Sequence, residues 1–183
     1  MIIGITGTIG AGKGTVADYL ISHEGYSHIS ARSLWTKELE SRGLPVNRDE
    51  MTKLANELRA KNGPAFFVEQ ALQIAKNIEG PVVIESIRTE AEAELLKKNG
   101  GIILAVDADR EIRYKRISGR GSKLDNVSFE DFVRQEKSEM ENSDPNKQSV
   151  AKVMEMADYT IFNDNDMEKL CEDIALFLEA FND

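Results

Sequence analysis

The amino-acid sequence predicts an α/β protein, a three-layer α/β/α sandwich built on a parallel five-stranded sheet. Short apolar runs alternate with segments of helical periodicity along the chain, and several of these runs end in a polar residue. A glycine-rich turn follows the first apolar run directly. In such folds, right-handed crossovers bring the carboxyl ends of the strands to one edge of the sheet, where ligands bind. We therefore expect the polar strand ends to form one site.

The first half of the chain contains two short strands and then a block of helices. Ile2–Ile5 is a β-branched run that predicts a strand, and Thr15–Ser22 has helical spacing. Tyr26–Ser30 is predicted as a second strand after the break at Gly25. Three helices without a strand between them follow, near Ser33–Ser41, Arg48–Lys61 and Pro64–Asn77.

The second half contains the strands predicted for the centre of the sheet. Pro81–Glu85 and Gly101–Asp107 are continuous apolar runs that end in a carboxylate, as expected of strands covered on both faces. The helix Thr89–Lys98 between them predicts parallel pairing. The chain continues with a helix at Arg110–Ser118, helix starts at Ser128 and at Asp144–Pro145, a strand at Tyr159–Phe162 and a closing helix at Met167–Phe181.

Composition and charge narrow the class of protein. The 183 residues suit one domain, and the net charge of −9 argues against a nucleic-acid partner. The single cysteine, Cys171, excludes a disulfide framework, and its helical apolar surroundings predict a buried structural thiol. The N-terminus lacks a basic segment followed by a long apolar run, so we expect a cytoplasmic protein with no membrane partner.

The glycine-rich turn is the strongest motif in the sequence. It reads Gly-x-x-x-x-Gly-Lys between a predicted strand and a predicted helix, the context that a phosphate-binding P-loop requires. Glycines let main-chain N–H groups turn around a phosphate, the helix N-terminus adds partial positive charge, and Lys13 can reach the β- and γ-phosphates. The motif therefore predicts the P-loop NTPase fold and a cofactor site made by Gly7, Gly10, Ala11, Gly12, Lys13, Gly14 and Thr15.

The loop alone leaves the reaction open. Gly14 stands where such loops usually carry the hydroxyl residue that contacts Mg²⁺, so this hydroxyl comes from Thr15 or is absent. A simple strand-to-helix turn is the plain alternative to phosphate binding, and the complete motif in its correct context argues against it. The motif does not distinguish kinases from GTPases or ATPases.

Further segments resemble one family. Gly-x-x-Gly-x-Gly-Lys-Gly-Thr is similar to the loop of adenylate kinases and other nucleoside monophosphate kinases, and to that of dephospho-coenzyme A kinases. Val83–Thr89 resembles the strand that ends beside the acceptor in these enzymes, and His28–Ser30 resembles the segment that opens their acceptor-binding helices. Ala105–Arg120 resembles their strand and lid-entering helix, and Phe162–Asp164 their loop near the adenine, which implies a nucleotide contact for Asn163.

The resemblance implies a division of the chain as well as ATP and Mg²⁺ as cofactors. We expect a single kinase domain over residues 1–183, with its core in residues 1–30, 80–118 and 143–183. Residues 31–79 would form a helical acceptor-binding insert. Residues 119–142 would form a short lid, because Gly119–Asn126 is polar and rich in residues that break secondary structure. The expected state is a monomer or a homodimer.

Two residues at the end of the third strand are candidates for the transfer site. Glu85 can hold a magnesium-bound water or orient the surroundings of the acceptor phosphate, and its plain alternative is a helix cap. Arg88 offers a planar fork, and the resemblance implies that it contacts the acceptor phosphate. A surface salt bridge is the alternative.

Arg32 and Trp35 lie in the segment where the family binds its acceptor, although core packing also suits Trp35.

Arginines at helical spacing are candidates for charge stabilisation. Arg113, Arg116 and Arg120 share one predicted helix face that leads into the lid, so they could converge on the triphosphate or form a solvated basic face. Arg120 is the preferred candidate, and Arg134 is a weaker one beyond the lid. His23 and His28 have no metal-binding pattern around them and are interpreted as ordinary structural or surface residues.

Three functions remain open from the sequence: a nucleoside monophosphate kinase, a dephospho-coenzyme A kinase, and a nucleotide-binding switch or ATPase without kinase activity. A hydroxyl acceptor benefits from a positioned carboxylate, but Ile29–Ser33 has arginine where dephospho-coenzyme A kinases have Asp-x-Asp. This favours a small monophosphate acceptor, which could be a ribonucleotide, a deoxyribonucleotide or a less usual monophosphate. The same stretch also departs from adenylate kinases, so the acceptor base stays open. Asn146–Ser149 lacks the final Asp of a guanine-reading segment, which disfavours a GTPase.

Overall fold

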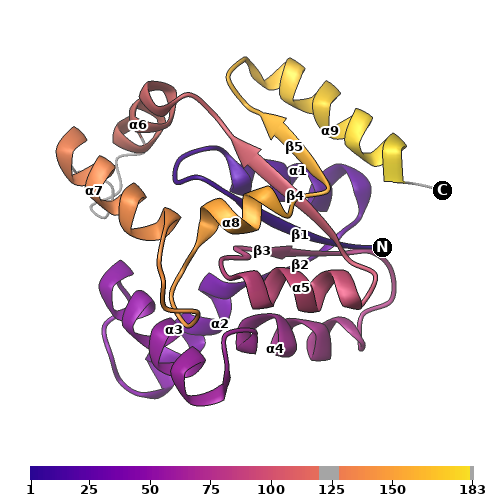
Figure 1. Ribbon diagram of the computed structural model, residues 1–183. Coiled ribbons are helices and arrows are strands. Elements are labelled where there is room, and N and C mark those ends of the chain that lie inside the picture. Colours follow the sequence, from indigo (N-terminus) through magenta and orange to yellow (C-terminus); the bar gives the residue numbers. More distant parts are fainter. Residues whose placement is uncertain (120–127, 182–183) are drawn as a thin grey trace.

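The computed structural model describes residues 1–119 and 128–181 and contains one parallel sheet (Figure 1). Its five strands stand in the order β2-β3-β1-β4-β5, so the strand that precedes the glycine-rich loop is central. Neighbouring strands of this sheet pair in parallel, which confirms the predicted fold class. The strands are β1 (Ile2–Gly7), β2 (Ser27–Ser30), β3 (Val82–Glu85), β4 (Ile102–Asp107) and β5 (Tyr159–Phe162).

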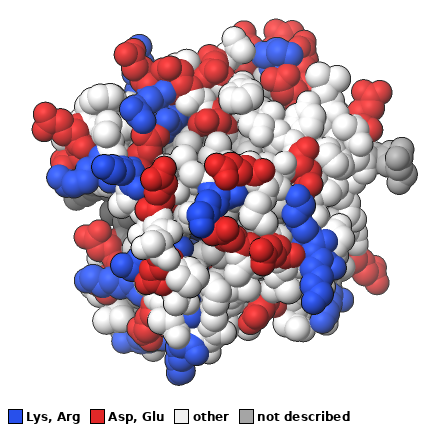
Figure 2. Space-filling view, viewed as in Figure 1, with Lys and Arg blue, Asp and Glu red and all other residues white. Residues whose placement is uncertain are grey.

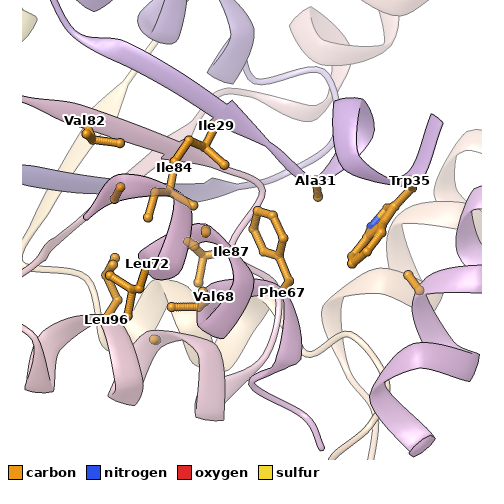
Figure 3. Packing of buried hydrophobic residues seen from close by; sticks show 14 of the residues in the cluster. Ile29, Ala31, Trp35, Phe67, Val68, Leu72, Val82, Ile84, Ile87 and Leu96 are labelled. Atoms are coloured by element: carbon orange, nitrogen blue, oxygen red, sulfur yellow. The ribbon is translucent and has the colours of Figure 1, made fainter. Parts of the chain in front are cut away.

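Helices cover both faces of the sheet, which explains why its central strands are continuously apolar. The helices are α1 (Lys13–Glu24), α2 (Ala31–Ser41), α3 (Arg48–Asn62), α4 (Phe66–Ala75), α5 (Glu90–Lys98), α6 (Arg110–Gly119), α7 (Phe129–Met140), α8 (Val150–Glu155) and α9 (Met167–Phe181). Alternate residues of β3 point to opposite faces: Val83 packs with α1 and α9, whereas Val82 and Ile84 pack with α4 and α5. Figure 3 shows the cluster that contains Val82 and Ile84, which extends through Phe67 to Trp35 of α2.

Side-chain caps explain where several helices begin. Ser30 accepts a hydrogen bond from the N–H of Ser33 at the start of α2, and Asn47 caps α3 in the same way. Thr89 and Glu92 form a reciprocal capping box at the start of α5. Ser128 caps α7 as predicted.

Two sequence predictions about the C-terminal third are wrong. Asp144 and Pro145 do not open a helix. Asp144 instead closes a turn, in which its carbonyl accepts from Lys147 N at 3.0 Å, and the helix starts later, at Val150. Cys171 is half-buried rather than buried, because α9 packs on the sheet through Leu170, Ile174, Phe177 and Leu178.

The α2–α3 pair and the α6–α7 pair lie at the side of the sheet where the strands end (Figure 1). Residues 120–127, which include Arg120 and part of the predicted lid at residues 119–142, lie outside the described residues. Acidic and basic side chains alternate over the face seen in Figure 2, as expected of a chain with mixed charge. In residues 1–119 and 128–181, every helix is too short or too polar to cross a membrane.

Candidate active site

The glycine-rich loop connects β1 to α1 at the carboxyl edge of the sheet. Gly7, Gly10 and Gly12 have φ values of 132°, 81° and 101°, which disfavour residues with a side chain. At Gly7 a Cβ atom would also collide with the main chain of Val106 in β4. The loop then runs into the N-terminus of α1, where main-chain N–H groups and the helix dipole suit a phosphate group.

Lys13 lies at the start of α1 with its ammonium group folded over the loop. Its Nζ donates to the carbonyl oxygens of Gly7 at 2.8 Å and of Thr8 at 2.7 Å. Burial is the main cause that lowers the pKa of Lys13 to about 7, and the positive charge of Arg88 contributes. A phosphate group at the loop would favour the charged form and would compete with these two carbonyls for the ammonium group.

Strand ends on one side hold the loop in place. Thr8 Oγ1 donates to Asp107 Oδ1 at 2.6 Å, so the end of β4 is bonded directly to the loop. Asn163, which follows β5, donates through Nδ2 to the carbonyl of Ala11 at 2.8 Å. Arg116 of α6 donates in turn to the carbonyl of Asn163 at 2.8 Å. The loop, α6 and the end of β5 are thus joined by one chain of hydrogen bonds.

A pocket of about 290 Å³ opens beside these contacts, and we call it the β5 pocket. It contains three residues that the sequence analysis proposed for the cofactor, Thr15, Arg116 and Asn163, together with Gly12 of the loop. Met167 and Leu170 at the start of α9 supply an apolar side. An apolar wall with a few polar groups is suited to a small organic ligand.

A larger pocket of about 480 Å³ lies on the other side of the loop, between the strand ends and the α2–α3 pair, and we call it the insert pocket. It brings together candidates that are far apart in the sequence: Lys13, Arg32, Trp35, Glu85 and Arg88. Gly12 lines both pockets, so the two meet at the loop beside Lys13.

Sequence comparison shows which families the chain belongs to. Residues 3–144 match the family described as the AAA domain. The UPF0200 protein of Pyrobaculum aerophilum is 31% identical over 180 residues, which are 97% of this chain and 96% of that protein. The chain belongs to the AAA domain family and to the UPF0200 proteins. The UPF0200 protein of Pyrococcus abyssi is 29% identical over 97% of this chain and 95% of that protein.

Solved structures show that this UPF0200 protein has the fold of P-loop kinases. Shikimate kinase from Bacteroides thetaiotaomicron matches with a TM-score of 0.62 at 16% identity, over 100% of this chain and 98% of that chain. Deoxyadenosine kinase from M. mycoides, solved with bound dATP, matches with a TM-score of 0.57 at 14% identity, over 100% of both chains. At these identities the likeness concerns the fold.

Glu85 and His28 form a pair at the strand ends of this UPF0200 protein. His28 Nε2 lies 3.1 Å from Glu85 Oε2, and this hydrogen bond is the main cause that lowers the pKa of Glu85. His28 is exposed, as expected of a surface residue, and it also lines the insert pocket. Strand register explains the contact: His28 pairs with Val83, and Glu85 follows Val83 on the same face of β3. His23, as expected, is exposed.

The oxygen atoms near the loop are compatible with Mg²⁺. Glu85 faces the first turn of α1, since its Oε1 would lie 4.0 Å from a Cβ atom on Gly14. Thr15 lies on the opposite side of the loop, in the β5 pocket. Within the described residues, no cluster of three His, Cys, Asp or Glu side chains is arranged to hold a metal ion. Mg²⁺ commonly uses one carboxylate together with phosphate oxygens and water, and the Glu85 carboxylate lies near enough to the start of α1 to be a candidate for that ligand.

Arg88 is half-buried in the insert pocket and reaches toward α7 and the loop before α8. Its Nη1 lies 2.9 Å from Glu139 Oε2 of α7 and donates to Gln148 Oε1 at 2.5 Å. The salt bridge considered as its alternative is present, but it is partly buried, because 26% of the Arg88 side chain and 18% of the Glu139 side chain are exposed. Arg88 therefore connects the pocket to α7 and to the loop before α8.

The other arginine candidates lie in different parts of the structure. Arg113 turns inward, where it donates to the carbonyls of Ala108 at 2.7 Å and of Ile9 in the loop at 3.2 Å and pairs with buried Glu136. The solvated basic face is therefore wrong for Arg113, and its contact with a triphosphate stays a prediction. Arg116 reaches the β5 pocket and Arg32 the insert pocket. Arg134 is exposed and pairs with Asp131 on its own helix, away from both pockets. The charge of Arg113 is neutralised by a partner that helical spacing alone could not reveal.

Four residues that the sequence analysis did not assign contribute to the two sites. Asp107 holds the loop through Thr8, and its position at the end of an apolar run was a usable signal. Arg59, Glu139 and Gln148 line the insert pocket, although each belongs to a polar segment that resembles an ordinary solvated surface. Their places depend on how α3, α7 and the loop before α8 dock against the sheet.

Proposed function

We propose that this protein is an ATP-dependent phosphotransferase that transfers the γ-phosphoryl group to a nucleoside or deoxynucleoside monophosphate. The observation that carries the proposal is the meeting of two pockets at Gly12, beside a lysine whose ammonium group lies over the loop. A kinase needs two neighbouring sites with positive charge between them, because phosphoryl transfer depends on alignment and charge neutralisation.

The β5 pocket is the proposed site for ATP. The base would lie between Arg116, Asn163 and the apolar side formed by Met167 and Leu170, and the polyphosphate would follow the main chain of the loop into α1. Lys13 would remain in contact with the γ-phosphoryl group as it moves, and Arg116 would supply a second positive charge. We retain Arg120 as a catalytic candidate from the sequence. Mg²⁺ held by Glu85 would neutralise phosphate charge when bound. Thr15, on the opposite side of the loop, stays a metal candidate from the sequence alone.

The insert pocket is the proposed acceptor site. Arg88 would bind the acceptor phosphate and exchange its contacts with Glu139 and Gln148 for phosphate oxygens, and exposed Arg32 would assist. Trp35 is 8% exposed and packs edge-on against Phe67, so it is a core residue with one surface toward the pocket. That surface suits a base. A phosphate oxygen is already a nucleophile, so this reaction needs no general base.

A second candidate is a kinase for a hydroxyl acceptor, such as dephospho-coenzyme A. The Glu85–His28 pair favours it, because a carboxylate in the insert pocket could accept the proton of an attacking hydroxyl group. The same carboxylate is our candidate ligand for Mg²⁺. Glu85 would therefore be a metal ligand in the first candidate function and a proton acceptor in the second.

An acceptor panel tests the proposal. The purified protein would be incubated with ATP and Mg²⁺, and ADP release would be measured with each common ribo- and deoxyribonucleoside monophosphate and with dephospho-coenzyme A. We expect release to rise with one or more monophosphates. A rise with dephospho-coenzyme A alone would support the second candidate, and ATP binding without release under any condition would indicate a nucleotide-binding switch.

A further inference from the structure

A buried ion pair forms part of the wall of the insert pocket. Arg59 of α3 and Glu92 of α5 are 3% and 0% exposed, and Arg59 Nε donates to Glu92 Oε1 at 3.2 Å. Arg59 lines the pocket. A buried charge is costly unless it is paired, so Glu92 makes it possible to keep a guanidinium group at this position. Arg59 Nη1 also donates to Asn56 Oδ1 at 3.5 Å. Because the ion pair is neutral overall, the remaining donors of Arg59 can bind a ligand that carries no second negative charge.

The second oxygen of Glu92 fixes the position of the pair relative to Arg88. Glu92 Oε2 accepts from the main-chain N–H of Arg88 at 2.7 Å and of Thr89 at 3.2 Å. One carboxylate therefore holds both the guanidinium group of Arg59 and the main chain of the residue proposed to bind the acceptor phosphate. Glu92 therefore fixes the distance between Arg59 and Arg88, so that each arginine could bind one end of the same ligand.

The wall next to Arg59 includes apolar side chains of α3 as well as the hydroxyl residue Thr52. Met51, Ala55 and Arg59 follow one another at intervals of four residues along α3, so they lie on one face of the helix, and all three line the pocket. Trp35 of α2 lines the same pocket and contributes an aromatic ring. A flat ring bound against this surface would meet Arg59 at one edge.

We propose that Arg59 determines which base the acceptor carries, and that it selects a base with an oxo group over adenine. The inference rests on the proposed function, in which the acceptor is a nucleoside monophosphate. An arginine side chain only donates hydrogen bonds, so an oxo group and a neighbouring ring nitrogen satisfy it. Adenine keeps N7 as an acceptor but carries an amine in place of the oxo group, so one of the two arginine donors would face another donor. The phosphate is assigned to Arg88, because its partner Glu139 is partly exposed and can be exchanged for phosphate oxygens, whereas Glu92, the partner of Arg59, is fully buried.

A matched pair of ligands gives the sharpest test. Inosine and adenosine monophosphate differ at purine position 6, where one carries an oxo group and the other an amine. Trp35 is the only tryptophan of the sequence and lines the pocket, so its fluorescence reports binding. We expect inosine monophosphate to bind about tenfold more tightly or better, which is the usual discrimination of a well-placed arginine contact.

The variant R59M/E92Q removes the guanidinium group without leaving a buried charge unpaired. The change at Glu92 keeps an amide oxygen that can accept from the N–H groups of Arg88 and Thr89, so the start of α5 is preserved. We expect the preference for inosine monophosphate to disappear in this variant, with thermal unfolding as the check on its fold. The control is Arg42→Met, which removes an exposed arginine paired with Glu38 and Glu57 and should leave the preference unchanged.

Several outcomes would overturn the inference. If the wild-type protein binds adenosine monophosphate as tightly as inosine monophosphate, or more tightly, Arg59 does not select an oxo group, although the proposed function stands. If R59M/E92Q weakens both ligands equally, Arg59 contacts the phosphate. If ATP binds but no monophosphate does, the proposed function fails and this inference fails with it.

Discussion

The phosphate loop and the insert pocket share Lys13, but they are built in different ways. The loop is a run of consecutive residues between β1 and α1, and its shape depends on glycines with positive φ. The insert pocket collects residues from segments far apart in the sequence, and ion pairs such as Arg59–Glu92 and Arg88–Glu139 hold its wall together. The loop therefore depends on backbone conformation, whereas the pocket depends on balanced charge.

The largest expected effect tests whether the phosphate loop depends on the backbone conformation of its glycines. Gly7→Ala would place a Cβ atom against the main chain of Val106 at a φ of 132°, so we expect the free energy of unfolding to fall by about 3 kcal/mol or more. Urea denaturation measures the loss. The matched control is Gly25→Ala at φ 71°, where a Cβ atom would meet open space, and the expected loss is about 1–2 kcal/mol. Equal losses would contradict the role of the β4 contact.

The second effect concerns the lysine between the two regions. We expect Lys13→Ala to lower turnover by about a hundredfold or more, because a charge that accompanies the migrating phosphoryl group is lost. ADP release under saturating ATP and acceptor measures it. Lys53→Ala removes a lysine that is 71% exposed and paired with Glu50, and it should retain full activity. Unchanged turnover in folded Lys13→Ala would refute the role.

The third effect separates the two pockets. Arg88→Ala should raise the apparent binding constant of the acceptor by about tenfold while that of ATP changes less, because a charged phosphate contact is lost on the acceptor side alone. Initial rates with each substrate varied in turn provide both constants. Arg134→Ala, at an exposed ion pair on α7, is the control. A similar rise for ATP and for the acceptor would argue against the assignment.

The smallest effect is a pH dependence of ATP binding. The pKa of Lys13 is about 7 in the free protein, and a bound polyphosphate should raise it, so the complex holds a proton that the free protein has partly lost. Affinity should therefore fall as the pH rises above about 7, by less than tenfold per pH unit. Calorimetry at about pH 8 in two buffers of different ionisation enthalpy should detect proton uptake. Lys13→Arg, which stays charged, should abolish the uptake, and buffer-independent heats in the wild type would contradict the shifted pKa.

The contrast between the two regions also explains how far the sequence could be interpreted. The strands, their parallel pairing and the loop follow from local patterns, and the structure confirms them. The places of Arg59, Glu139 and Gln148 depend on docking between distant segments, which no local pattern records. Arg113 shows the same limit, because its spacing on α6 was clear but the partner that draws it inward, Glu136, belongs to α7. Asp144–Pro145 shows that a sequence suited to a helix start can also close a turn.

The hydrogen bond from Asn163 to Ala11 joins residues that are 152 positions apart. During synthesis, the N-terminal loop leaves the ribosome long before the end of β5 does. This corner of the protein therefore cannot be assembled until most of the chain has been translated, and a prematurely terminated chain would lack it. If the corner holds ATP as proposed, the ligand would stabilise finished copies of the protein and leave unfinished ones exposed to proteolysis.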